Sequence, residues 1–225
     1  MTAPTLPPPL LPASLASGGS RWAASAWLIA RGGAQQTLLG GQLGASQGGV
    51  RATYTLDQGR RIALAGRLAT PLRGRGAEAA IGLDWQPTRA PIHLVAEQRL
   101  SLDGGRGGPT LEVIGGFGPV DLGAGLRAEG YGQAGAIARD GLQTFADGAV
   151  RITHPLTRGR LRLDLGAGAW GGAQPGTARL DIGPSLGMSM PLAGKSIRLT
   201  LDWRERIAGA ASPGSGPALS IGSDF

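Results

Sequence analysis

The sequence predicts an all-β protein, an antiparallel up-and-down β-barrel of about twelve strands that spans a membrane. Three observations carry this prediction. Apolar and polar residues alternate with period two in one segment after another, the connections between segments alternate between short and longer, and aromatic residues gather at one end of the predicted strands. The expected organisation is a Pro-rich leader over residues 1–20, disordered or peripheral, and a barrel over 21–225.

The alternation is clearest between Thr177 and Ser189. Leu180 and Ile182 share one parity with the other apolar residues, whereas Arg179 and Asp181 share the opposite parity with the polar ones. A strand places these sets on opposite faces, whereas a helix mixes them. The pattern recurs along the chain in segments long enough for tilted membrane-spanning strands, which need about 9–11 residues. The predicted strands are 21–31, 43–56, 60–70, 77–86, 91–101, 109–117, 120–135, 144–154, 159–170, 177–190, 196–207 and 216–225.

The composition excludes several other classes of protein. The 41 glycines follow no Gly-X-Y period, which rules out collagen. The chain has no cysteine, so disulfide scaffolds, cysteine zinc sites and thiol nucleophiles are excluded. The net charge of +7 comes almost entirely from arginine and suggests anionic partners, but the arginines form no tail or helix face, so nucleic acid is not expected. No apolar run reaches the roughly 18 residues of a transmembrane helix.

An export signal is not evident in residues 1–20. This segment lacks a basic stretch, and Pro7, Pro8 and Pro9 interrupt its apolar run. Three explanations stay open: a mis-assigned start, a chain that is the C-terminal part of something longer, or a wrong barrel prediction.

The predicted connections alternate in length. The short ones lie around Gln58, Pro87-Thr88, Gly118-Pro119, Leu156-Thr157 and Ala193-Gly194. The longest of the others are Gly32–Gln42, Ala136–Gly141 and Ala208–Ser215. Short periplasmic turns and longer outer loops are typical of bacterial outer-membrane barrels, and an even strand count puts both termini on the periplasmic side.

This topology predicts an aromatic girdle, because aromatic residues of outward parity fall at the periplasmic strand ends. They are Trp22, Tyr54, Trp85, Phe117 and Phe225, and Trp203 would belong to the outer end. Such rings are typical of membrane barrels, although aromatic residues cap strand ends in other β proteins too. A terminal Phe225 after alternating apolar residues looks like the C-terminal recognition signal of outer-membrane barrels. We therefore expect outer-membrane lipid and, through Phe225, the barrel-assembly machinery as partners.

The opposite parity carries the charged residues and predicts an arginine-rich lumen. Its arginines are Arg51, Arg61, Arg67, Arg99, Arg127, Arg151, Arg160, Arg162, Arg179, Arg198, Arg204 and Arg206. Its acids are Glu78, Asp84, Glu97, Glu112, Asp121, Glu129, Asp147, Asp164, Asp181 and Asp202. Alternation alone does not say which face points inward, because a soluble barrel or sandwich would bury the apolar face. A soluble barrel of this strand number would, however, be too wide for these mostly small apolar residues to fill.

Two roles stay open for the lumen charges. Arginines opposite acids on neighbouring strands form ladders that set strand pairing. Alternatively, a modest positive bias makes a conduit that favours anionic solutes or an acidic glycan, with Arg198, Arg204 and Arg206 on one strand as the best candidates.

No catalytic, metal or cofactor site is predicted, and we do not expect an enzyme. His93 lies near Glu97 and Arg99 on the charged face, and we interpret it as a hydrogen-bonded filler rather than as part of a Ser–His–acid site. His154 falls at a strand end. The glycines of 104–108 lack the strand-to-helix context of a phosphate-binding loop, and no metal-ligand spacing is present.

Several stretches resemble the C-terminal membrane domain of the bacteriophage adsorption protein A family. They are SQGGVR (46–51), EAAIGLDWQP (78–87), HLVAEQR (93–99) and EGYGQAGAIARDGLQTFADGAVRITHP (129–155). The resemblance implies an outer-membrane barrel similar to polysaccharide-export porins, in which periplasmic helical repeats precede the barrel and an inner-membrane glycosyltransferase is the partner. The repeats of that family are missing from this sequence, so periplasmic glycan capture and phage adsorption do not carry over directly.

The sequence thus predicts a bacterial outer-membrane barrel acting as a conduit or surface receptor, for an anionic or surface polysaccharide. The alternatives are a structural or docking barrel with a plugged lumen, and a soluble all-β binding protein.

Overall fold

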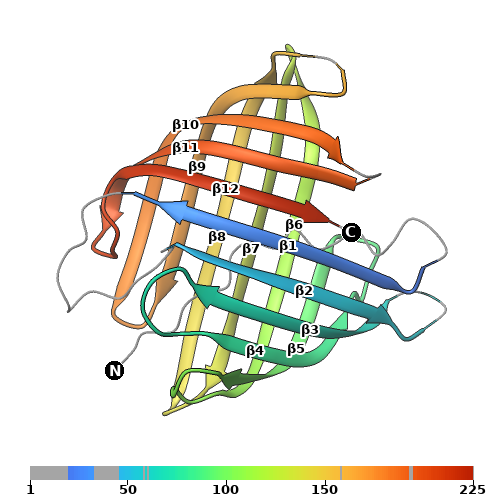
Figure 1. The fold of residues 1–225 in the computed structure, drawn as a ribbon, viewed down its shortest axis with the longest axis vertical. Helices are drawn as coiled ribbons and strands as arrows, with labels where there is room; N and C mark the ends of the chain where they lie inside the picture. Colours follow the sequence, from blue (N-terminus) through green and yellow to red (C-terminus); the bar gives the residue numbers. More distant parts are fainter. Residues whose placement is uncertain are drawn as a thin grey trace.

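The computed structural model describes residues 20–32, 46–57, 59, 61–157, 159–192 and 195–224. Within them, twelve antiparallel strands form one closed barrel, so the predicted all-β barrel is confirmed (Figure 1). The strands are β1 (Trp22–Arg31), β2 (Gln47–Thr55), β3 (Ile62–Pro71), β4 (Glu78–Trp85), β5 (Ile92–Ser101), β6 (Gly108–Gly123), β7 (Leu126–Ala138), β8 (Leu142–Pro155), β9 (Arg162–Gln174), β10 (Thr177–Leu192), β11 (Lys195–Gly209) and β12 (Gly216–Asp224).

Each strand pairs with its neighbours in the sequence, and β1 pairs with β12 to close the ring. In this closing pair Ser25 lies opposite Asp224, and Arg31 lies opposite Ala218. Closure pairs both edges of every described strand, which is how a sheet avoids exposed backbone hydrogen-bonding groups. No helix in the described part of the chain is long and apolar enough to cross a membrane.

Side chains of opposite parity lie on opposite faces of the barrel wall. Leu186 on β10 and Ile81 on β4 point outward and are 42% and 55% exposed. Asp181 on β10 and Arg99 on β5 point inward and are 0% and 1% exposed. The apolar face is therefore the outer surface, and the interior is lined mainly by polar and charged side chains, with some buried apolar ones such as Val95 and Ile137 among them. A soluble barrel has the reverse arrangement, so this finding argues against the soluble alternative.

The strand ends define two rims. We call the rim that carries the start of β1 and the end of β12 the termini rim, and the opposite one the distal rim; in Figure 1 the front strands have the termini rim at the right. The termini rim includes the connections 56–61, 86–91, 124–125 and 156–161. The distal rim includes 72–77, 102–107, 139–141, 175–176 and 210–215.

The predicted difference in loop length between the rims is wrong for the described connections. Connections 72–77 and 102–107 on the distal rim are no longer than 56–61 and 86–91 on the termini rim. The strands themselves extend further than expected: Ala136–Ala138 belong to β7, and a turn with Asp140 and Gly141 at positive φ follows. Gln58, Ala193-Gly194 and most of Gly32–Gln42 lie outside the described residues.

The turn expected at Gly118-Pro119 is also in a different place. Strand β6 continues to Gly123, and the turn is Ala124-Gly125, whose φ values of 52° and 73° match the twist of a two-residue hairpin. The β6–β7 register shifts between Phe117 and Val120, so an irregularity takes up Gly118-Pro119. Proline is tolerated at such an irregularity because its missing N–H interrupts no regular ladder there.

Candidate functional site in the barrel lumen

Most of the predicted lumen charges line the interior. The buried ones are Arg51, Arg99, Arg151, Arg179, Arg204, Glu97, Glu112, Asp181 and Asp202. Asp164, Arg198 and Arg206 are half-buried, and Arg127 and Arg162 are exposed near strand ends. Arg160 is exposed in the connection 156–161, outside the strands, because β9 begins three residues later than expected, at Arg162.

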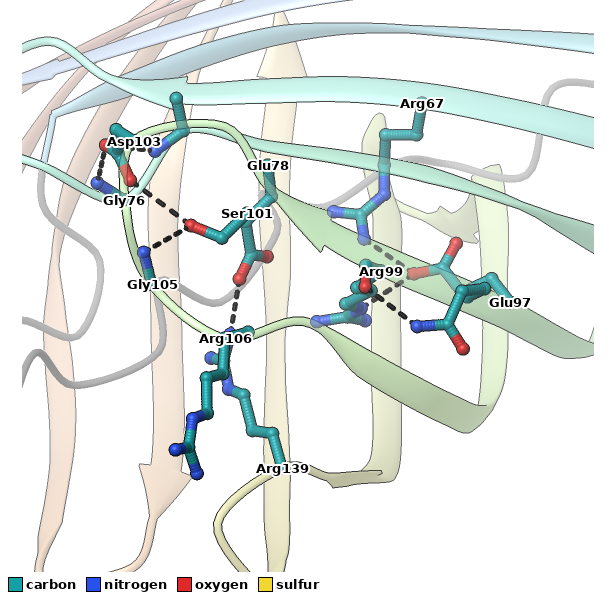
Figure 2. A network of polar contacts seen from close by, with 12 residues as sticks. Arg67, Gly76, Glu78, Glu97, Arg99, Ser101, Asp103, Gly105, Arg106 and Arg139 are labelled. Atoms are coloured by element: carbon teal, nitrogen blue, oxygen red, sulfur yellow. Dashed lines mark hydrogen bonds and ion pairs between the residues drawn. The ribbon is translucent and has the colours of Figure 1, made fainter.

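One charged network runs across β3, β5 and β6, and Figure 2 shows its part between Arg67 of β3 and Glu97 and Arg99 of β5. Arg67 Nη2 lies 2.6 Å from Glu97 Oε1, and Arg99 Nε contacts the same oxygen at 2.8 Å. Arg99 Nη2 continues the chain to Glu112 Oε2 at 2.9 Å. The Arg99 guanidinium also lies over the ring of Phe145 on β8, 5.1 Å from its centroid. Two arginines and two carboxylates thus satisfy one another where water hardly reaches them.

A second network joins β2, β4 and β5. Arg51 Nη2 lies 2.6 Å from Asp84 Oδ2, and His93 Nδ1 lies 2.6 Å from Asp84 Oδ1. His93 is therefore hydrogen-bonded to Asp84 of β4. It is not bonded to Glu97 or Arg99, which lie on the same face of its own strand. Among the described residues, no group of three or more His, Cys, Asp or Glu side chains could hold a metal ion.

A third network centres on Arg151 of β8. This guanidinium contacts Glu129 of β7 at 2.6 Å and Asp164 of β9 at 3.0 Å, and its Nε donates to Ser185 of β10 at 2.8 Å. Ser185 in turn donates to Asp202 on β11. The chain of contacts therefore spans neighbouring strands from β7 to β11, as expected for charge ladders.

Four arginines cluster at the distal end of the lumen. Arg31 Nη1 lies 3.2 Å and Arg179 Nη2 lies 2.6 Å from Asp181 Oδ2. Arg204 Nη2 lies 3.0 Å from Asp202 Oδ2, and its guanidinium covers the Trp170 ring at 4.5 Å. The fourth, Arg206, donates a hydrogen bond to the backbone carbonyl of Pro213. We call Arg31, Arg179, Arg204 and Arg206 the distal arginine cluster.

The connection 210–215 folds against this cluster. Ala211 and Ser212 are 0% and 7% exposed, and Pro213 is buried as well. The carbonyl oxygen of Pro213 accepts a hydrogen bond from Arg179 Nη1 at 3.1 Å and another from Arg206 Nη2. Ala211 packs with Phe145, which projects from β8 on another part of the wall. This loop therefore narrows the distal mouth of the lumen.

Sequence reasoning missed several lumen residues. Trp27, Phe145, Ser185 and Arg31 are buried inside the barrel but were not singled out. Their inward parity was the available signal. The Trp27 ring lies so close to Gly49 that a Cβ there would be 2.4 Å from it, which is why a glycine stands at that position.

The expected girdle residues within the described part of the chain lie on the outer surface, but Phe117 and Trp203 are not at strand ends, because β6 continues to Gly123 and β11 to Gly209. Trp22, Trp85, Phe117 and Trp203 are 42–64% exposed, and the Trp22 and Tyr54 ring centroids are 5.0 Å apart. Glu205, a charged residue of outward parity, accepts hydrogen bonds from Trp203 Nε1 at 3.2 Å and from Ser215 at 2.8 Å. Phe225 lies outside the described residues.

The distal-rim connections 72–77 and 102–107 are joined through Asp103 (Figure 2). Its carboxylate accepts hydrogen bonds from the backbone N–H of Gly76 and of Ala77, the latter at 2.8 Å. The hydrogen bond from Gly76, followed by that from Ala77, lowers the pKa of Asp103 below its ordinary value of 3.8. Nearby, Arg139 of the connection 139–141 contacts Glu78 at 2.5 Å, a pair that strand parity alone could not predict.

No family model matches the sequence, and no curated protein matches it either. Solved structures match in fold. The NanC porin shares 9% identity over 90% of this chain and 98% of its own, with a TM-score of 0.45. An outer-membrane channel from Pseudomonas putida F1 shares 12% identity over 93% of this chain and 96% of its own, with a TM-score of 0.47. A bacterial polysaccharide outer-membrane secretin shares 10% identity over 92% of this chain and 99% of its own, also with a TM-score of 0.47.

These likenesses extend to the fold alone. The closed twelve-strand antiparallel ring with its apolar outer surface is the architecture of outer-membrane β-barrels.

Proposed function

We propose that this chain lies in a bacterial outer membrane and passes or captures anionic solutes through its lumen. The observation that carries the proposal is the charge at the distal mouth. Within the part of the chain that the structure describes, the four guanidinium groups of the distal arginine cluster contact two carboxylates, Asp181 and Asp202. Elsewhere in the lumen most of the buried acids pair with arginines, and Asp147 instead accepts hydrogen bonds from Tyr131 and Gln133. The local positive excess therefore lies at the entrance, where it attracts anions before they reach the balanced interior.

The outer surface supports the membrane location. Large apolar side chains cover it, and Trp22, Tyr54 and Trp85 stand at or next to strand ends on the termini rim, so the surface matches a lipid environment and would be an aggregation hazard in water. Outer-membrane lipid, and the barrel-assembly machinery acting through Phe225, are the partners that this location requires. We assign no catalytic step to the chain.

The solute class follows from the guanidinium groups. Arginine binds carboxylate and phosphate groups through paired N–H donors, and such groups occur on acidic surface polysaccharides. The resemblance to the bacteriophage adsorption protein A family also favours a polysaccharide. We therefore propose an acidic glycan, or a fragment of one, as the solute.

Single-channel recording in planar bilayers tests the conduit. Under a KCl gradient, we expect a reversal potential of anion-selective sign. The double variant Arg204→Gln/Arg206→Gln should move it towards cations. Arg106→Gln is the matched control, because it removes a positive charge from a 78%-exposed side chain on the same rim but outside the lumen. A cation-selective wild-type pore, or an unchanged potential in the double variant, contradicts the proposal.

A second candidate, a structural or docking barrel with a plugged lumen, is favoured by the burial of the lumen charges. The side chains of Arg99, Glu97 and Glu112 are only 1–2% exposed, and connection 210–215 narrows the mouth. Absence of conductance under every gradient, in a barrel whose folded state is verified by heat-modifiable gel mobility, would favour this candidate over the conduit.

A further inference from the structure

We propose that the distal mouth contains one oxyanion-binding site, and that the carbonyl oxygen of Pro213 occupies it when no solute is bound. Binding of a sugar carboxylate or a phosphate then displaces connection 210–215 and opens the mouth. This inference rests on the proposed function in one respect, since the bound anion is taken to be the solute that the lumen passes. The site itself depends only on the geometry around Pro213.

Two guanidinium groups from different strands converge on one acceptor atom. Arg179 of β10 and Arg206 of β11 both donate to the Pro213 oxygen, at 3.1 Å in the case of Arg179 Nη1. Paired guanidinium donors of this kind are the usual partners of a carboxylate or phosphate oxygen. A neutral carbonyl in their place gains less electrostatic stabilisation than an anion would.

The charge around this acceptor is not balanced. Arg31 lies close enough to Arg179 and Arg204 for mutual electrostatic repulsion, and Arg179 lies close enough to Arg206. Asp181 and Asp202 are the carboxylates in contact with this cluster, and Arg206 has no ion pair among the described residues. A bound monoanion or dianion would supply the negative charge that the Pro213 carbonyl lacks.

The cluster also has unused donors. Within the described residues, Arg31 Nε and Nη2, Arg204 Nε and Arg206 Nε are buried without a hydrogen-bond partner, and the Arg31 side chain is only 1% exposed. One acceptor nearby, Asp181 Oδ1, is also without a partner, so donors outnumber acceptors. Buried unpaired donors are costly, and an oxyanion with several oxygens would satisfy more of them than one carbonyl does.

Binding must move the loop, because the Pro213 carbonyl occupies the point where the two guanidinium groups converge. An anion can accept from both Arg179 Nη1 and Arg206 Nη2 only when that carbonyl leaves them, and Ala211, which packs with Phe145, moves with it. The anion therefore binds the open mouth better than the closed one and shifts the population towards it. The loop thus competes with the anion for the same two guanidinium groups, and its neutral carbonyl binds them less strongly than an anionic oxygen does.

Two measurements on the detergent-solubilised full chain test the site. Calorimetric titration with sodium glucuronate, inorganic phosphate and glucose should detect binding of at least one anion and none of glucose. Because the chain has no cysteine, Ala211→Cys gives a single thiol that reports on the loop. Its labelling by a water-soluble maleimide should be slow without ligand and about tenfold faster with saturating anion, which corresponds to about 1.4 kcal/mol. Thr88→Cys, exposed on the termini rim, should label at the same rate throughout.

The arginine variants locate the site. Arg206→Gln should weaken anion binding about tenfold or more, and Arg206→Lys, which keeps the charge but loses the fork, should fall between Gln and wild type. Arg106→Gln should bind as wild type does. Heat-modifiable mobility verifies folding of each variant.

Each outcome has a defined meaning. Binding of glucuronate alone identifies a sugar acid, and binding of phosphate alone identifies a phosphate group. Failure of both anions to bind at millimolar concentration overturns the inference, as does binding that leaves Ala211→Cys labelling and Arg206→Gln affinity unchanged. Anion binding without conductance in bilayers removes the conduit but keeps the site, whereas anion-selective conductance without binding removes the site but keeps the conduit.

Discussion

Arg198 on β11 donates to both carboxylate oxygens of Glu129 on β7, with Nη1 and Oε2 2.5 Å apart. In the barrel wall, β8, β9 and β10 lie between these two strands. The ion pair therefore crosses the lumen instead of following the wall. Glu129 also contacts Arg151, so a single carboxylate joins the cross-lumen pair to the ladder on β8 to β10.

We expect Glu129→Gln to destabilise the barrel on the order of 3 kcal/mol, because the buried guanidinium of Arg151 and the half-buried one of Arg198 lose their shared carboxylate. Urea unfolding in lipid vesicles, followed by tryptophan fluorescence, measures the change. Arg198→Gln is the control and should cost less, since Glu129 then keeps Arg151. Wild-type stability of Glu129→Gln would mean that the cross-lumen pair does not form.

Arg99 provides a second test of the lumen networks. Arg99→Gln leaves Glu97 and Glu112 buried and facing each other without their shared cation, and should cost roughly 3–5 kcal/mol of folding free energy. Arg99→Lys keeps the positive charge but not the planar fork of donors, so its stability should lie between that of Arg99→Gln and that of the wild type. The same urea assay measures all three proteins, and equal stability of Arg99→Gln and wild type would contradict the network.

The outer surface predicts a depth-dependent cost for charge. Leu186, near the middle of β10, lies between Leu165 and Leu201 on neighbouring strands, so Leu186→Arg should cost about 2–4 kcal/mol in a bilayer. Leu142→Arg, the same change at the first residue of β8, should cost about 0–1 kcal/mol. Folding yield and stability in vesicles give both values. Equal costs would argue against a membrane around the middle of the barrel.

The five tryptophans separate the two faces of the wall. In single-tryptophan variants, brominated lipid should quench the fluorescence of the outward-facing Trp22, Trp85 and Trp203. It should leave Trp27 and Trp170 unquenched, because they are 8% and 7% exposed inside the lumen. Quenching of the lumen pair with protection of the other three would reverse the assignment of the faces.

Asp103 gives a pH prediction for the distal rim. Its pKa is lowered by the N–H donors of Gly76 and Ala77, so the ionised carboxylate holds the loop together above the ordinary value of 3.8, and this contribution is lost as the pH falls through the lowered pKa. The amide proton shifts of Gly76 and Ala77 should titrate by NMR with a midpoint below 3.8. Asp103→Asn should abolish this titration. Asp57→Asn should not affect it, because Asp57 accepts from Ile62 on the other rim.

The sequence was a good guide to the barrel because one physical rule acts along every strand. Residues two apart share a face, so Leu180 and Asp181 had to point to opposite sides whatever the details of packing. Turn positions depend on more than local signals. Gly118-Pro119 has the composition of a turn, yet the ladder absorbs it in an irregularity and continues to Gly123.

The individual contacts in the lumen were beyond sequence reasoning. Parity placed Arg198 and Glu129 on one face, but their meeting depends on how the closed wall curves. The contact of the Pro213 carbonyl oxygen with Arg179 of β10 and Arg206 of β11 likewise depends on the path of the connection 210–215. No periodic pattern carries that information, since a loop has no repeating geometry.

The pairing of β1 with β12 has a consequence for how the protein assembles. These two partners are the most widely separated strands in the sequence, so β1 is without its second neighbour until every other strand is in place. In hydrocarbon each backbone N–H or C=O group without a hydrogen-bond partner at a sheet edge costs several kcal/mol, so a partly inserted sheet is not a stable intermediate. Such a large sequence separation also slows the search for the closing pair. Insertion should therefore proceed as one cooperative event. Until β12 pairs with it, the free edge of β1 needs another hydrogen-bonding surface that keeps it out of the hydrocarbon.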